Sequence, residues 1–367
     1  MTPKKPEPER PLDDVFAQFR SSLLDSLRRA VDARSPGPLL GVASMLLNFL
    51  SSTDVEPAAT STVVRALTTL HRMETSAGAL AVAILAGDAD LRRWVRRDLA
   101  DRGFTVPRWL ADLQNCAPVD RAVEVAGPFR DVDELVVGIT TPSGHAFTAI
   151  VRVDNELGAR DSGGDLYERP LDTVLAGLRL PDGADIHLRD ISPADARARL
   201  EAALSGIDLD AVMGTGTEWQ YQRPLLRWML GFLPAGGDAT VPGSIDDVDL
   251  DAVTADFLAS PWGRPWTRGG LPLLAESVLG DGLGNGIGDP LLWAPHHVRR
   301  LLSPDPSYEI LEHLDADRTP ELLRDVIRYG HAKRGLRPEL TDRTLAAVDR
   351  YAGAFLDSVR GWDADAG

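Results

Sequence analysis

The side chains of this sequence that could do chemistry are few and scattered. The chain has one cysteine, Cys116, and seven histidines in 367 residues. Cys116 lies beside Pro118, with no histidine at a spacing that would indicate activation, and a lone thiol usually serves as small packing material. The sequence therefore predicts no catalytic residue, no metal site and no cofactor, and it leaves open whether the protein is an enzyme.

The most conspicuous local pattern is the glycine-rich stretch at residues 280–289. A dinucleotide fingerprint needs G-x-G-x-x-G directly after a strand, whereas here Ile287 takes the third glycine position and the preceding residues are helical in pattern. The stretch has no lysine, which excludes a Walker loop. Asp281, Asn285 and Asp289 offer oxygens to calcium, but the EF-hand alternation is absent. We interpret the stretch as a connector, with a ligand or metal loop as the alternative.

Tryptophan, arginine and histidine gather on both sides of this stretch. Aromatic anchors with arginine are typical of binding hot spots and concave sites, although tryptophans also fill cores. Packing is the favoured interpretation and a binding surface the alternative. The candidate ligand-binding residues are Trp262, Arg264, Trp266, Trp293, His296 and His297.

His145 is the remaining candidate ligand-binding residue. Strand alternation places it at the start of an apolar face, where a histidine is more often a hydrogen-bonded edge residue than a catalyst. A metal site with Asp154 and Asp161 would need both ends of a strand roughly 30 Å long, at about 3.3 Å per residue, to meet. The spacing excludes that joint coordination.

The overall charge limits the classes of partner. A formal charge of −16 and a pI near 4.9 repel phosphate backbones and anionic lipid surfaces, so we expect no nucleic-acid partner. The arginines between residues 92 and 102 are interpreted as a solvated helix face. The longest apolar run, residues 39–50, is shorter than the roughly twenty residues that a bilayer requires, so no membrane association is expected. The first residues lack an apolar stretch, and we expect a cytoplasmic protein.

The hydrophobic periodicity changes twice along the chain. It is helical up to Pro118, where it changes to the period of two that is typical of strands. Residues 133–140 and 145–154 flank the turn at 141–144 and predict a hairpin. Helical signals return and end in two antiparallel helices, the first closed by Gly335 and the second capped by Thr341.

These segments predict an α+β protein that is mostly α-helical, with a small antiparallel sheet of three to five strands between two helical regions. The proline- and charge-rich start is unsuited to a packed core. The predicted organisation is a disordered tail at 1–12, an N-terminal helical region at 13–118, a small α+β region with an antiparallel meander at 119–205, and a C-terminal helical region at 206–367.

Several motifs resemble an uncharacterised family of actinobacterial proteins that has no assigned activity. One has the form G-H-x-x-T-x-x-V-x-x-D-x-x-L-G and spans residues 144–158. The others are FLASP at 257–261, PLLWAP at 290–295, LLRDVIRY at 322–329, RGL at 334–336 and TLAAVD at 344–349. The resemblance covers about residues 13 to 360 and implies an order of elements but no mechanism.

On these grounds the favoured hypothesis is a cytoplasmic protein that acts through protein–protein interaction or regulation, with another protein as its partner. The alternative is an enzyme or small-molecule sensor of unfamiliar type with a pocket near residues 262–297. The sequence leaves the oligomeric state open.

Overall fold

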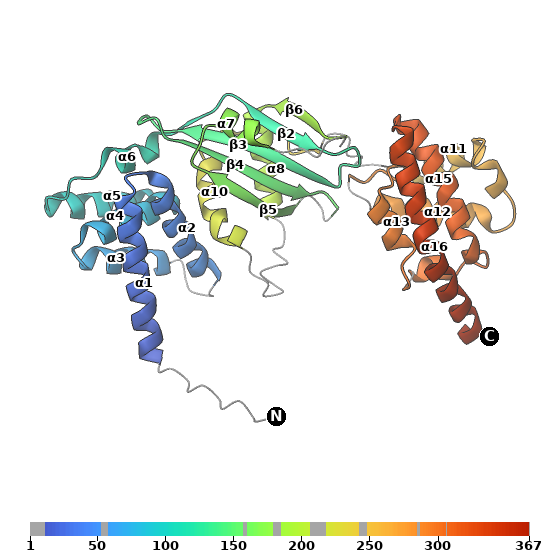
Figure 1. The fold of residues 1–367 in the computed structure, drawn as a ribbon, viewed down its shortest axis with the longest axis horizontal. Coiled ribbons are helices and arrows are strands. Elements are labelled where there is room, and N and C mark those ends of the chain that lie inside the picture. The colour runs from blue at the N-terminus through green and yellow to red at the C-terminus, as the bar shows by residue number, and fades with distance from the viewer. Residues whose placement is uncertain are drawn as a thin grey trace.

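The computed structural model describes residues 12–52, 58–156, 160–178, 185–205, 218–241, 248–284, 287–305 and 307–366. Within them, a group of N-terminal helices lies at one end, an antiparallel sheet with flanking helices lies in the middle, and a second helical group lies at the other end (Figure 1). The predicted α+β class is confirmed, with helices before and after the sheet. Among the described helices, none is both long and apolar enough to cross a bilayer.

The N-terminal helices pack around α4, whose side chains from Thr75 to Leu85 are all buried. A helix that is apolar on every side is stable only when neighbours surround it. Here α1, α2, α3 and α5 provide that cover. The elements of this group are α1 (Leu12–Asp32), α2 (Pro36–Ser52), α3 (Ala58–Thr69), α4 (Met73–Leu85), α5 (Ala89–Asp101), α6 (Arg108–Ala111) and η1 (Asp112–Asn115).

The sheet is antiparallel in the order β5-β4-β3-β2-β6, with β1 paired to the end of β3. The predicted hairpin is confirmed as β3 and β4, in the register Val136↔Ile150. The sheet has six strands, one more than the upper limit of the predicted three to five. The additional strand is β1, whose two-residue pairing with β3 is too short to give a period-two pattern in the sequence. The strands are β1 (Ala117–Pro118), β2 (Ala122–Ala126), β3 (Val132–Thr140), β4 (Ala146–Asp154), β5 (Arg160–Tyr167) and β6 (His187–Ile191).

Helices cover both faces of the sheet. Leu135, Val137 and Val151 share a core with α8 and α10, whereas Val136 and Ile150 pack against α7 on the opposite face. Because both faces are covered, consecutive residues are buried from Leu135 to Ile139 in β3 and from Phe147 to Val151 in β4. The covering elements are α7 (Leu171–Gly177), α8 (Pro193–Ser205), η2 (Glu218–Gln222) and α10 (Arg223–Leu230).

The C-terminal helices surround a second core, which contains Phe257, Phe355 and two tryptophans. The predicted antiparallel pair is present as α15 and α16, and Gly335 ends α15 with the left-handed φ of 65° that favours glycine. Thr341 does not cap α16, because that helix already begins at Pro338, a residue suited to the first turn. The elements are α11 (Leu250–Ala259), η3 (Arg264–Trp266), α12 (Leu271–Leu283), α13 (Pro295–Leu301), α14 (Tyr308–Leu311), η4 (Ala316–Arg318), α15 (Thr319–Arg334) and α16 (Pro338–Ala366).

The turn between β2 and β3 connects the sheet to the C-terminal helices. Phe129 in this turn belongs to a small core with Ile287, Leu292 and Leu340. Its ring lies 5.9 Å from that of His331 in α15. This contact brings the turn-bearing end of the sheet against α13 and α15.

Candidate functional site

Two turns at one end of the sheet form one side of the candidate site. Asn155 follows β4 and ties the turns together: its backbone N–H donates to the Asp131 carbonyl at 2.9 Å, and its side-chain amide donates to the Arg130 carbonyl at 2.8 Å. Arg130 has a φ of 53°, which is unfavourable for a non-glycine residue and costs of order 1–3 kcal/mol. The turn geometry is therefore held by side-chain contacts.

Those contacts extend into a buried network of charges under the sheet. Arg199 of α8 donates to both Glu124 and Asp133, the second at 2.7 Å, and Arg130 also donates to both. Burial by itself raises the pKa of Glu124, but the hydrogen bonds and charges of Arg199 and Arg130 outweigh it and hold the pKa below its ordinary value. The network fixes the β2–β3 turn, and through Asn155 it also fixes the position of Glu156.

Glu156 meets two histidines in the first turn of α13. Its Oε1 atom lies 2.6 Å from Nε2 of His297 and also within hydrogen-bond distance of Nε2 of His296. On the other side of its ring, Nδ1 of His296 lies 3.9 Å from a carboxylate oxygen of Asp131. The sheet thus presents two carboxylates to the adjacent histidines of the helical region.

The backbone fixes the proton of His297. The Ala294 N–H donates to Nδ1 of His297 at 3.1 Å. This is the capping arrangement in which the side chain of the third helical residue accepts from the backbone of the residue that precedes the helix. With Nδ1 accepting, the neutral ring carries its hydrogen on Nε2 and donates it to Glu156. Burial and the neighbouring His296 lower the pKa of His297 to about 4, so this ring is neutral at pH 7.

Glu156 is correspondingly held ionised. Burial alone raises the pKa of this carboxyl, but the hydrogen bonds from His296 and His297 outweigh it and keep the pKa below its ordinary value. An ionised carboxylate that accepts from two imidazoles is a fixed anchor between the sheet and α13. Glu156 and His296 are both half-buried and can be reached by solutes, whereas His297 is buried.

The same cluster could in principle hold a metal ion, since the ligand atoms of Glu156, His296 and His297 all lie within 4.8 Å of one another. A metal on His297 would need the Nε2 lone pair, with Nδ1 donating its hydrogen elsewhere. The Ala294 N–H points its hydrogen at Nδ1 and opposes that tautomer. The residues therefore fit a hydrogen-bonded cluster better than a metal site.

Two adjoining clefts open beside this cluster. One, of about 630 Å³, is lined by Glu156, Asp281, His296, Arg299, Arg300, Leu301, Ser303, Pro304, Asp305 and Ser307. The other, of about 470 Å³, lies between α13 and α16 and is lined by Pro295, His296, Arg299, Arg343, Ala346, Ala347, Arg350 and Tyr351. We call the first the mixed cleft and the second the basic cleft. His296 and Arg299 line both, so the clefts adjoin at these two side chains.

The three tryptophans predicted as ligand-binding residues lie in or against the C-terminal core. Trp266 and Trp293 are 2% and 0% exposed; the first donates its N–H to Asp325 at 3.0 Å and the second to the Pro290 carbonyl at 2.9 Å. Trp262 is half-buried, with its ring 6.2 Å from that of Tyr329. Arg264 is exposed in η3. Of the residues predicted near the glycine-rich stretch, only His296 and His297 belong to the candidate site.

The two ends of the glycine-rich stretch have different roles, since its first residues belong to α12 and its last residue pairs with α15. Asp281 lies in α12 and lines the mixed cleft, whereas Asp289 is buried and accepts a bidentate contact from Arg334. Asn285 lies outside the described residues. The Asp289–Arg334 pair indicates that this carboxylate serves packing between the segment and α15.

His145 lies at the other end of β4 from Glu156, as the strand length requires. Its Nδ1 atom lies 3.1 Å from Oε1 of Glu168, which also accepts from the Ser35 hydroxyl, while Oε2 accepts from the Gly37 N–H at 3.1 Å. Both hydroxyl and imidazole face the carboxylate rather than each other, so this is not a nucleophile–base arrangement. Glu168 instead attaches the start of α2 to the sheet.

We expect Glu168→Ala to lower the free energy of unfolding by about 1–3 kcal/mol, because the Gly37 N–H and the Ser35 hydroxyl lose their acceptor. Glu168→Gln keeps one acceptor oxygen and should cost less. Urea denaturation monitored by circular dichroism measures both. Equal stability of the alanine variant and the wild type would show that Glu168 does not attach α2.

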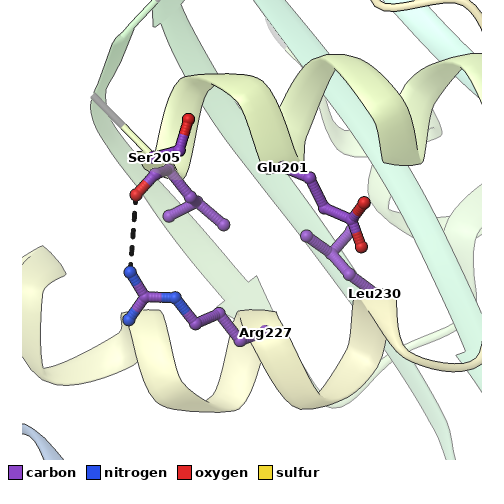
Figure 2. A pocket seen from close by; sticks show the side chains of 5 residues that line it. Glu201, Ser205, Arg227 and Leu230 are labelled. Carbon is purple, nitrogen blue, oxygen red and sulfur yellow. Dashed lines mark hydrogen bonds between the residues drawn. The ribbon is translucent and has the colours of Figure 1, made fainter.

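Other candidate positions offer less chemistry. Burial raises the pKa of Cys116 to about 12, so it is not a thiolate nucleophile. A pocket of about 400 Å³ between α8 and α10, shown in Figure 2, contains one arginine and one carboxylate, and Arg227 donates to the Leu204 carbonyl at 3.4 Å. An apolar groove of about 430 Å³ among α1, α2 and α3 has only Arg20 and Thr69 as polar groups. A small molecule would find few orienting contacts in either.

Comparisons with protein-family models, with proteins of curated function and with solved structures found no match to this chain. Sequence reasoning singled out the two histidines but missed Glu156, which is 140 residues away from His296 in the chain and has no motif of its own.

Proposed function

We propose that this protein binds a small anionic molecule in the basic cleft and acts as a ligand-dependent regulatory protein. The observation that carries the proposal is the composition of that cleft. Three arginines and a histidine line it and no carboxylate does, in a chain whose formal charge is −16. An arginine-lined concavity attracts anions despite the acidic surroundings, because nearby charges dominate over distant ones that salt screens.

The arginines of the basic cleft are available to a ligand. Among the described residues, neither Arg299 nor Arg343 makes an ion pair or hydrogen bond, and Arg350 lies over the ring of Tyr351 at 5.4 Å. On the same helix, by contrast, Asp349 pairs with Arg324 of α15 at 2.7 Å. Free guanidinium groups that converge on one cleft are suited to bidentate recognition of a phosphate or carboxylate.

The regulatory part of the proposal rests on His296. This side chain lines the basic cleft and also contacts Glu156, which belongs to the turn after β4. An anion near His296 competes with Glu156 for the hydrogen bond of the imidazole. This competition alters the contact between the sheet and the C-terminal helices, and so offers a route from ligand to conformation.

The test is isothermal titration calorimetry of the full chain with pyrophosphate as the probe. We expect binding by the wild type, and a loss of affinity of at least about tenfold in the double variant Arg299→Gln, Arg343→Gln, because each removed guanidinium contributes more than about 1 kcal/mol to a charge-assisted contact.

The matched control is Arg97→Gln, which removes an exposed arginine of α5 far from the cleft. It should leave the affinity unchanged. If the wild type does not bind pyrophosphate, or if all three proteins bind it equally, the basic cleft is not an anion site and the proposal is wrong.

A further inference from the structure

The mixed cleft indicates what the rest of the ligand is. We infer that the ligand is a phosphorylated sugar or polyol, whose phosphate lies in the basic cleft and whose hydroxyl groups lie in the mixed cleft. This inference rests on the proposed function, because it assigns the anionic end of the ligand to the arginines between α13 and α16.

Phosphate fits the basic cleft better than a single carboxylate does. Arg299, Arg343 and Arg350 present three planar guanidinium groups from two helices. A phosphate monoester carries close to two charges and three terminal oxygens, and it can therefore accept from several guanidinium groups at once. A carboxylate has two oxygens and one charge and would leave part of the set unused.

The lining of the mixed cleft fits hydroxyl groups. Asp281, Asp305 and Glu156 offer acceptors, Arg299 and Arg300 offer donors, and Ser303 and Ser307 offer hydroxyls that do both. A sugar hydroxyl also donates and accepts, so it can bond to either kind of group. An ammonium group only donates, so the three carboxylates would attract it, but Arg299 and Arg300 would repel it and it could not accept from them. The mixture of charges therefore favours a neutral, polyhydroxylated body over an amine.

The two clefts are placed to hold one molecule. His296 and Arg299 line both, so the clefts adjoin at these side chains, and the two ends of one ligand can contact them from either side. Their volumes, about 470 and 630 Å³, lie within the usual range of about 300–1,000 Å³ for small-molecule sites. A hexose or pentose phosphate can therefore occupy both.

The experiment compares inorganic phosphate with a panel of hexose and pentose monophosphates, and with phosphoethanolamine, by calorimetry on the full chain. At least one sugar phosphate should bind about tenfold or more tightly than inorganic phosphate, as one or two further hydrogen bonds would provide. Phosphoethanolamine should bind no more tightly than inorganic phosphate. The variant Asp305→Asn should reduce the advantage of that sugar phosphate without changing the affinity for inorganic phosphate, and Asp342→Asn, an exposed α16 carboxylate outside both clefts, is its control.

The outcomes separate the two proposals. If inorganic phosphate binds but no sugar phosphate binds more tightly, or if phosphoethanolamine binds best, the sugar assignment is wrong and the anion site stands. An unchanged sugar advantage in Asp305→Asn would also contradict it. If no member of the panel binds but pyrophosphate does, the sugar assignment is again wrong and the anion site stands; if pyrophosphate does not bind either, both proposals are wrong.

Discussion

Replacing Arg199 with alanine is expected to lower the free energy of unfolding by about 3 kcal/mol or more, because it leaves two buried carboxylates short of a partner. Glu124 and Asp133 are 1% and 0% exposed, and Arg199 contacts both of them. Arg130 remains but cannot replace both contacts. Urea denaturation at pH 7 measures the loss.

Arg189 provides the control for that measurement. It approaches the other oxygen of Glu124 at 2.7 Å, but about half of its side chain is exposed. Because water solvates the exposed Arg189 guanidinium, and Glu124 keeps Arg199 and Arg130 as partners, Arg189→Ala should cost no more than about 1 kcal/mol. If the two alanine variants are equally stable, the buried network does not hold the β2–β3 turn, and our account of how Glu156 is positioned loses its support.

The second large effect is a dependence of stability on pH that comes from His297. Its pKa is about 4 in the folded protein, against about 6.5 for an unfolded histidine. Between these values the unfolded chain binds a proton that the folded chain does not, so stability increases with pH. The contribution is complete above pH 6.5 and is lost as the pH falls towards 4, for a total of about 3 kcal/mol.

His297→Gln should flatten the dependence of unfolding free energy on pH between 5 and 6.5, measured by urea denaturation. His187→Gln, at an exposed position in β6, is the control and should leave the slope as in the wild type. Burial also lowers the pKa of His331, so part of the slope remains in the His297 variant. A slope identical in wild type and His297→Gln would contradict the assignment of a neutral, buried His297.

The fold was largely predictable because its signals are local. The change from helical to strand periodicity near Pro118, the turn at 141–144 and the glycine at 335 each act within a few residues, and the structure has β3, β4 and the end of α15 where these signals put them. The start of α16 was missed by four residues, because a cap at Thr341 would begin the helix at residue 342 whereas it begins at Pro338, and both residues are acceptable near a helix start.

The candidate site was only half predictable. His296 and His297 stand out as a pair in the sequence, but their partner Glu156 is an ordinary acidic residue after β4, and its role exists only because the fold brings it against the first turn of α13. The arginines of the basic cleft come from two helices more than forty residues apart, and exposed arginines are too common for their convergence to be read from spacing. The tryptophans were candidates because they gather near the glycine-rich stretch, and the structure shows that they gather there to pack in and against the C-terminal core.

The buried network was not predictable either. Glu124 and Arg199 are 75 residues apart, and a charged residue in a strand ordinarily indicates a solvated face. Here the face is covered by α8, whose Arg199 supplies the compensating charge. Such a pair can be recognised only in the folded structure, since the sequence around neither residue indicates that the other will be its partner.

The measurement that tests the central claim most directly is calorimetric titration of pyrophosphate into the wild type and the Arg299→Gln, Arg343→Gln variant side by side. The account predicts saturable binding to the wild type that weakens by at least about tenfold in the variant. Equal affinities, or heats no larger than dilution for the wild type, would contradict it.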